Sequence, residues 1–119
     1  MSWYLAKMVF RIICGDGNHM AQFDEQLRLV SAASKEEAFQ KAQLLGVKEE
    51  EMFFNQQQQL VQWQFISVSE LYRLNELIDG AELYSRIEEK ENADNYLHIV
   101  HKKAEQIRFG NSHELLNLV

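Results

Sequence analysis

The sequence predicts an α+β domain with a mainly antiparallel sheet of about four strands and two helices packed on one face, in the order β-β-α-β-β-α. Two observations carry this prediction. Residues 3–14 alternate like one long strand, and two later stretches combine helical spacing of apolar residues with a capping residue at the start. The long strand is apolar or half-apolar on both faces, so we expect it at the centre of the sheet.

Residues 3–14 have one uniformly apolar face and one face that cations interrupt. The even-numbered side chains form the apolar or amphipathic face: Tyr4, Ala6, Met8, Phe10, Ile12 and Cys14. The odd-numbered side chains form the mixed face: Trp3, Leu5, Lys7, Val9, Arg11 and Ile13. Because side chains alternate between the two faces of a strand, we expect the first set to face the core.

A second strand is predicted over residues 22–32, after a glycine-rich turn at residues 15–21. We expect it to pair antiparallel with the first strand. Its predicted core face carries Phe23, Leu27 and Leu29, and its predicted outer face carries Asp24, Gln26 and Arg28.

A helix is predicted to start at Ser34, which forms a capping box with Glu37, and to end at Leu45. Gly46 is typical of the residue that follows a helix. The apolar stripe of this helix carries Ala38, Ala42 and Leu45, with Phe39 at its flank. The two alanines indicate that the helix lies close to the sheet.

The second half of the chain predicts two more strands and a helix. The strands cover residues 60–68, with Val61, Trp63 and Phe65 toward the core, and residues 81–88, at a sheet edge. Residues 47–55 could hold a helical turn, and residues 69–78 fit either a helix or a strand. The last helix runs from the N-cap Asn92 to about Arg108. We therefore predict a single domain over residues 1–110 and a tail over residues 111–119.

Composition restricts the cellular setting. The chain has 119 residues, a net charge of −6 and one cysteine, which fits one domain without an internal disulfide in a reducing compartment. We expect no signal peptide and no membrane span, because no charged start is followed by a long apolar run. The location is therefore predicted to be cytoplasmic. The acidic balance disfavours nucleic acid as a partner.

The loop from Cys14 to His19 carries the richest chemistry. It offers a thiol, the carboxylate of Asp16, the amide of Asn18 and the imidazole of His19, and such a group could bind an anion or a metal, or carry a nucleophile. The alternative, which we favour, is a turn in which Asp16 and Asn18 bond to their own backbone.

The mixed face of the long strand is the second candidate. Lys7 and Arg11, together with Arg28 of the second strand, are expected to share it with Trp3 and Tyr84. Cations interleaved with aromatic rings could stack single-stranded nucleic acid. We favour the alternative of a protein interface, since exposed aromatic patches usually mark partners.

No metal site and no cofactor are predicted. Asp94, His98, His101 and Glu105 lie on one flank of the last helix, and we interpret them as a solvated flank because metal sites normally draw ligands from more than one element. The sequence contains no P-loop, GxGxxG, CxxC or GxSxG motif.

The stretches WYLAK and VFRIICGDGNH near the start, with QFDEQLRLV, WQFISVSEL and DGAELYSRIEE further on, resemble a bacterial family filed as domain of unknown function number 4288. The likeness extends to about Ile107. Its motifs are specific to the family and to no chemistry, so the resemblance implies no catalytic residue. It does imply that Trp3, Tyr4, Lys7, Arg11 and the loop from Asp16 to His19 belong to the family's core pattern.

These observations predict a non-enzymatic binding or protein-interaction module that self-associates. The alternatives are a small enzyme that uses the Cys14–His19 loop and a binder of single-stranded nucleic acid. We expect a homodimer, and the partner could also be another protein or a small molecule. The predicted contact face is apolar and carries Trp3, Leu5, Val9, Ile13, Val30, Ile66 and Val68.

Overall fold

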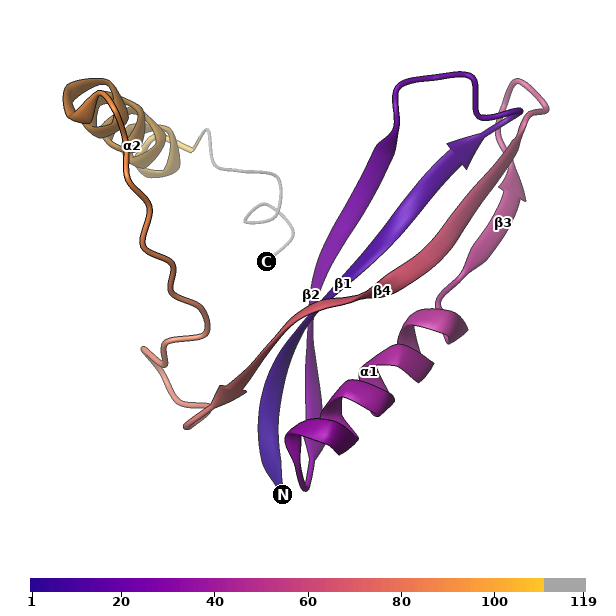
Figure 1. Ribbon diagram of the computed structural model, residues 1–119. Helices are drawn as coiled ribbons and strands as arrows, with labels where there is room; N and C mark the ends of the chain where they lie inside the picture. Colours follow the sequence, from indigo (N-terminus) through magenta and orange to yellow (C-terminus); the bar gives the residue numbers. More distant parts are fainter. Residues whose placement is uncertain (111–119) are drawn as a thin grey trace. The chain divides into compact units, whose positions relative to one another are not determined.

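A computed structural model describes residues 1–110 and has the predicted α+β fold (Figure 1). Its elements are β1 (Ser2–Cys14), β2 (Gln22–Ala32), α1 (Lys35–Lys48), β3 (Glu51–Phe54), β4 (Leu60–Leu74) and α2 (Ala93–Arg108). The chain forms two compact units, residues 1–85 and residues 86–119, and each is described by itself. The single domain over residues 1–110 stays a prediction, and the tail over residues 111–119 lies outside the described part.

The first unit is a four-stranded sheet with the order β2-β1-β4-β3, in which every neighbouring pair is antiparallel. The predicted central position of β1 is confirmed, because it pairs with β2 along one edge and with β4 along the other. The β1–β2 register sets Tyr4 opposite Val30, Ala6 opposite Arg28 and Lys7 opposite Leu27. Opposite residues share a face of the sheet, so this register decides what each face carries.

α1 lies along one face of the sheet (Figure 1) and closes the core of this unit. The even-numbered side chains Ala6, Met8 and Phe10 of β1 are buried there with Ala42 of α1. The buried residues of α1 are Ala38, Ala42 and Gly46, which are all small and lie one turn apart. Small residues at this spacing let a helix approach a sheet closely. The predicted core face of β1 and the predicted close approach are both confirmed.

Ser34 caps the N-terminus of α1 as predicted, since its hydroxyl accepts a hydrogen bond from the Glu37 amide at 3.1 Å. The Glu37 carboxylate, however, accepts from the Ala33 amide at 3.1 Å, one residue before the position that a capping box uses. The C-terminus of α1 is not where the sequence places it. The helix continues through Gly46 and ends at Lys48, with Glu49 as its C-cap. Gly46 serves packing instead, since a Cβ built on it would lie 2.2 Å from Cε1 of Phe65.

The predicted faces of β2 are reversed. Leu27 lies opposite Lys7, and Phe23 lies opposite Arg11, so these apolar side chains are on the face away from α1. Arg28 lies opposite Ala6 and is on the α1 side. The face prediction was wrong because it assumed that the polar residues of β2 face water. On the α1 side they have hydrogen-bond partners instead: Asp24 accepts a hydrogen bond from the Trp63 indole at 3.1 Å.

The buried residues of β2 lie near its C-terminal end. Val30 is only 3% exposed and Val68 of β4 is 9% exposed, and both belong to the core with Met8. Val30 and Val68 were predicted on the open contact face, and that part of the prediction is wrong. Leu5 does lie on the face away from α1, but it is only 4% exposed, so it is not part of an open surface.

The third and fourth strands also differ from the prediction. Residues 51–54 form the short strand β3, not a helical turn. β4 extends beyond the predicted end to Leu74, and residues 81–88 contain no strand. The register between β1 and β4 shifts twice, between Lys7 and Met8 and between Val9 and Phe10. Each shift is a bulge that leaves one residue of β4 without a partner on β1, which along β4 is first Ile66 and then Ser69.

In the second unit, α2 begins and ends as predicted. The Asn92 side chain accepts a hydrogen bond from the Asn95 amide at 3.0 Å, and the helix ends at Arg108. Within residues 1–110, neither helix has the length and apolar character that a membrane crossing needs.

We predict that Gly46→Ala destabilises the protein by about 1–3 kcal/mol, because the new methyl group overpacks the contact with Phe65. In an unobstructed helix interior the same change stabilises by about 1 kcal/mol. Urea denaturation measures the difference. The control is the same change in a Phe65→Ala background, where we expect the cost to disappear. A Gly46→Ala protein more stable than the parent would contradict the close packing.

Candidate functional site

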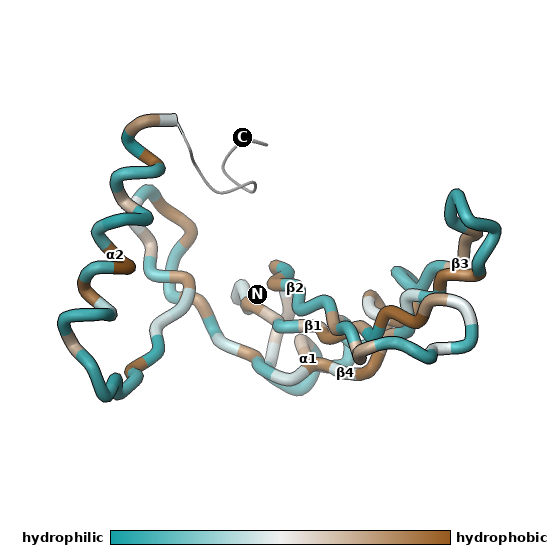
Figure 2. The backbone as a smooth tube through the Cα atoms, turned by 90° about the horizontal axis from the view of Figure 1, so that it is seen from above, coloured by the Kyte–Doolittle hydropathy of each residue, from teal (hydrophilic) through white to brown (hydrophobic). Residues whose placement is uncertain are grey.

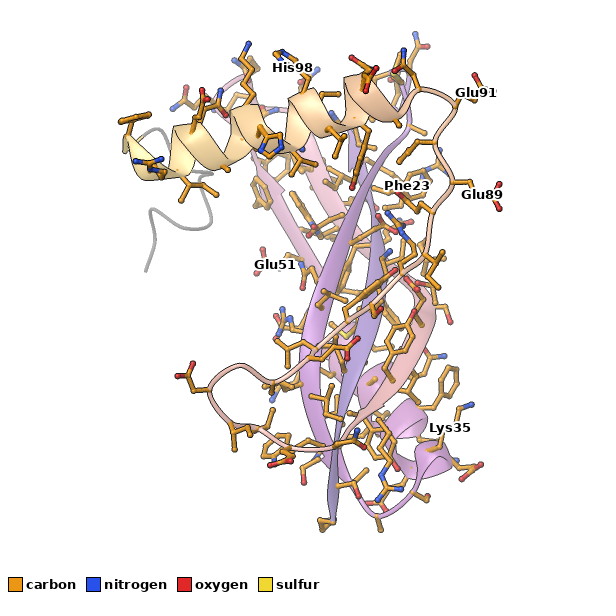
Figure 3. The ribbon with its side chains drawn as sticks, turned by 90° about the vertical axis from the view of Figure 1, so that its left-hand side faces the viewer. Phe23, Lys35, Glu51, Glu89, Glu91 and His98 are labelled. Carbon is orange, nitrogen blue, oxygen red and sulfur yellow. The ribbon has the colours of Figure 1, made fainter. Side chains whose placement is uncertain are left out.

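The face of the sheet opposite α1 carries a strip of exposed apolar side chains. We call this side the open face, and it holds the odd-numbered residues of β1 and their partners on β2. The apolar strip comprises Trp3, Phe23, Leu27 and Leu29, which are 44%, 55%, 53% and 49% exposed. In Figure 3, Phe23 on β2 and Lys35 on α1 mark opposite ends of this unit. The strip is a surface on which a partner could bury apolar area.

A polar cluster lies on the open face beside the apolar strip. The Lys7 ammonium is 3.1 Å from a Glu25 carboxylate oxygen and 2.9 Å from one of Glu70. The Tyr72 hydroxyl donates a hydrogen bond to the other Glu70 oxygen. Lys7 thus joins β2 to β4 across the central strand. Its charge is compensated by two carboxylates, which makes it a poor anchor for a phosphate group.

The cluster shifts the pKa values of its members in a consistent direction. The hydrogen bond from Lys7 to Glu70, followed by that to Glu25, raises the pKa of the lysine above its usual 10.5. The hydrogen bond to Glu70 raises the pKa of Tyr72 from 10.0 to about 12, because ionisation of the phenol would set two anions side by side.

The segment that follows β4 adds a second aromatic ring. The rings of Tyr72 and Tyr84 meet edge to face, with centroids 5.4 Å apart. This segment returns beside the end of β4, and the two line an open pocket of about 400 Å³ to which Tyr72, Leu74 and Tyr84 contribute. Tyr84 thus lies beside Tyr72 of the polar cluster, although the segment that carries Tyr84 is not the predicted strand.

The cations predicted to share the open face are separated. Arg11 lies there as predicted, and its guanidinium carbon is 5.9 Å from the centroid of the Phe23 ring. Arg28 lies on the other side, where its guanidinium is 3.6 Å from Glu49 at the end of α1. The β1–β2 register explains why the two arginines are separated. It sets the even-numbered residues of β2 opposite the even-numbered residues of β1, so both sets face α1.

The loop after β1 brings Asp16, Asn18 and His19 together in one hydrogen-bonded turn. The Asp16 carboxylate accepts from the Asn18 amide at 2.9 Å. One nitrogen of the His19 ring, Nε2, accepts from the Cys14 amide at 3.0 Å, and Nδ1 lies 2.8 Å from the Met20 carbonyl oxygen. Since that oxygen can only accept, Nδ1 carries the proton. Both ring nitrogens are thus engaged with the backbone.

The Cys14 thiol is tied to the hairpin between β3 and β4. It donates to the Gln59 side-chain oxygen at 3.4 Å, and the Asn55 amide nitrogen lies 3.6 Å from the sulfur. The loop and the hairpin therefore brace each other at this end of the sheet. No bond between the thiol and the His19 ring is present, so the pair is not arranged as a nucleophile and its base.

Several residues of the site were not predicted from the sequence. Glu25, Glu70 and Tyr72 form the polar cluster with Lys7, and Asn55 and Gln59 hold Cys14. Glu25 alternates with apolar neighbours on β2 and could have been found from the strand period. The β4 residues share the face of Lys7 with Gln62 and Gln64, but which of them lies opposite Lys7 could not be found, because the two bulges at Ile66 and Ser69 move the pairing by two residues.

Within residues 1–110, no group of three or more histidine, cysteine or acidic side chains could hold a metal ion. Asp94, His98, His101 and Glu105 all lie on α2. His98, labelled in Figure 3, is on the exposed surface of that helix.

A family model described as "Domain of unknown function (DUF4288)" matches residues 3–85. The matched region ends where the first unit ends, at residue 85. It thus includes the apolar strip, the polar cluster and the loop after β1. No curated protein and no solved structure matches the chain.

We predict that an ultraviolet titration shows one late tyrosine, Tyr72, which ionises above the ordinary range of a tyrosine. Because folding raises its pKa from 10.0 to about 12, its contribution to stability is complete below pH 10.0 and is lost as the pH rises through about 12. Glu70→Gln should return the late tyrosine to the ordinary range. Glu25→Gln is the matched control, since Glu25 contacts Lys7 and should leave Tyr72 unchanged. A late tyrosine that persists in Glu70→Gln would contradict this assignment.

Proposed function

The chain belongs to the DUF4288 family of domains of unknown function, and we propose that it acts as a non-enzymatic interaction module that self-associates through the open face of its sheet. The apolar strip carries this proposal. Trp3, Phe23, Leu27 and Leu29 are each about half exposed on adjacent strands. Exposed apolar patches of this kind usually mark sites of association.

The composition of the open face supports a protein partner. Aromatic and leucine side chains form its apolar part, and Arg11 stands beside Phe23 at its margin. Protein interfaces combine an apolar centre rich in aromatic residues with a polar margin in which arginine is favoured. A nucleic-acid surface would instead need uncompensated cations, and Lys7 lies between two carboxylates.

The arrangement of the loop after β1 supports a non-enzymatic role. A histidine that acts as a general base needs a ring nitrogen directed at the group that it deprotonates. In His19, Nε2 accepts from the Cys14 amide and Nδ1 bonds to the Met20 carbonyl. We therefore assign Asp16, Asn18 and His19 to the shape of the turn and not to ligand binding.

A second copy of the chain is the partner that we favour. In a two-fold dimer the same patch meets itself, so an apolar strip on one copy finds an apolar strip on the other without any further requirement. Burial of apolar surface is favourable by about 25 cal/mol per Å² before the costs of association are subtracted. The single cysteine fits a reducing compartment, and the proposal places the module in the cytoplasm.

We predict that the full chain is a dimer at micromolar concentration and that Leu27→Glu raises its dissociation constant by about tenfold or more, because a carboxylate would be buried in the contact. Sedimentation velocity measures the constant. Gln40→Glu is the matched control, since it adds the same charge on the exposed side of α1. Circular dichroism confirms that both variants are folded. A monomer across the concentration range, or a Leu27→Glu protein that associates like the parent, would contradict the proposal.

A further inference from the structure

Helix α2 presents an apolar stripe along its whole length, and none of its residues is buried. The stripe comprises Ala93, Tyr96, Leu97, Val100, Ala104 and Ile107. These positions recur every three or four residues, which places them on one side of a helix. Apolar and polar residues alternate along the turns of α2 in Figure 2. The polar side of the helix suits water, while the stripe needs a partner.

We propose that α2 pairs in antiparallel orientation with α2 of a second copy of the chain. This inference rests on the self-association proposed above and adds a second contact between the same two chains. The two-fold axis passes near Val100, which is close to the middle of the helix bounded by Ala93 and Arg108. Val100 of one copy then packs against Val100 of the other.

The stripe is complementary to itself in this orientation. With Val100 at the centre, the level of Tyr96 on one helix coincides with that of Ala104 on the other, and the level of Ile107 coincides with that of Ala93. Each large side chain therefore meets a small one, which lets the two helices approach closely. A parallel pair would set Tyr96 against Tyr96 and leave gaps at both alanines.

The charges of α2 favour the same orientation. The acidic residue Asp94 lies in the first turn and the basic residue Arg108 in the last turn. They project from the same flank of the stripe, and they are about 21 Å apart along one helix at 1.5 Å per residue. In an antiparallel pair the same flanks face each other, so each Asp94 reaches Arg108 of the other copy. In a parallel two-fold pair these flanks would lie on opposite sides of the contact, and Asp94 would stay about 21 Å along the axis from Arg108 of the other copy, so neither charge would find its partner.

A pair of 16-residue helices buries little surface, so by itself it would hold two chains together only weakly. Its contribution becomes useful when another contact already joins the same two chains, because the second contact then forms at a high effective concentration. The inference therefore predicts that α2 strengthens a dimer whose other contact is the open face.

Charge exchange tests the orientation in the full chain. In Asp94→Arg two arginines would meet at each end of the helix pair, and in Arg108→Asp two aspartates would meet. We expect each variant alone to dimerise about tenfold more weakly than the parent, since attraction becomes repulsion at two equivalent sites. An equimolar mixture of the two variants should recover the parent affinity as a heterodimer, because each chain then meets an opposite charge. Sedimentation velocity with one variant fluorescently labelled detects that heterodimer.

A second pair of variants tests the stripe. Val100→Glu should weaken the dimer by about tenfold. Asn95→Glu adds the same charge on the opposite side of α2 and should change nothing, while circular dichroism verifies that helix content is retained. If the mixture of charge variants does not associate more tightly than either variant alone, the antiparallel pair is wrong. If Val100→Glu weakens the dimer without recovery in the mixture, α2 docks on another surface.

The two proposals fail in different ways. If the open face is not a contact but the helix pair exists, Leu27→Glu leaves the dissociation constant unchanged while the charge variants still follow the predicted pattern. If the open face is the only contact, Leu27→Glu weakens the dimer while the α2 variants have no effect. A chain that is monomeric at every concentration overturns both.

Discussion

The close packing of α1 against β1 is the constraint on which the rest of the first unit depends. Ala38, Ala42 and Gly46 are small enough for the helix to lie against the sheet, and Met8 and Phe10 fill the space between. This contact commits the even face of β1 to the core. α1 covers one face of the sheet, so within residues 1–85 the apolar side chains of β2 on the other face are about half exposed, although Leu5 of β1 on that same face is only 4% exposed.

What the sequence predicted well is local. The alternation in β1 is uninterrupted, so its faces could be assigned, and the caps Ser34 and Asn92 marked both helix starts. The turn over Asp16 and Asn18 was likewise expected from its residue types. Each of these features depends on residues within a few positions of one another.

What the sequence could not predict depends on register. The faces of β2 follow from which of its residues lie opposite Lys7, and nothing within β2 itself fixes that choice. The partners of Lys7 on β4 depend on two bulges that shift the pairing. The edge strand expected at residues 81–88 does not form: its alternation of charged and apolar residues is real, but β3 is the strand at the β4 edge of the sheet, where it pairs with Leu60–Trp63.

The reversal of β2 strengthens the functional interpretation. Had Phe23, Leu27 and Leu29 faced α1, the open face would be largely polar and would need no cover. Their actual position places apolar side chains on both sides of Glu25 along β2, beside a polar cluster in which Lys7 is bound by two carboxylates. The second unit also has an uncovered apolar surface, since α2 has an apolar stripe and no buried residue. Two apolar surfaces in one short chain are most simply explained by a second copy that covers both.

Hydrogen–deuterium exchange, recorded at protein concentrations below and above the dimer midpoint, tests this account most directly. Local protection reports which segments gain contacts when two chains meet. The account predicts that amides of β2 and α2 exchange more slowly at the higher concentration. Amides of β1 and α1 should change least, because they are already paired or lie on the covered side. Equal exchange of β2 and α2 at both concentrations would contradict the claim that these two surfaces join copies of the chain.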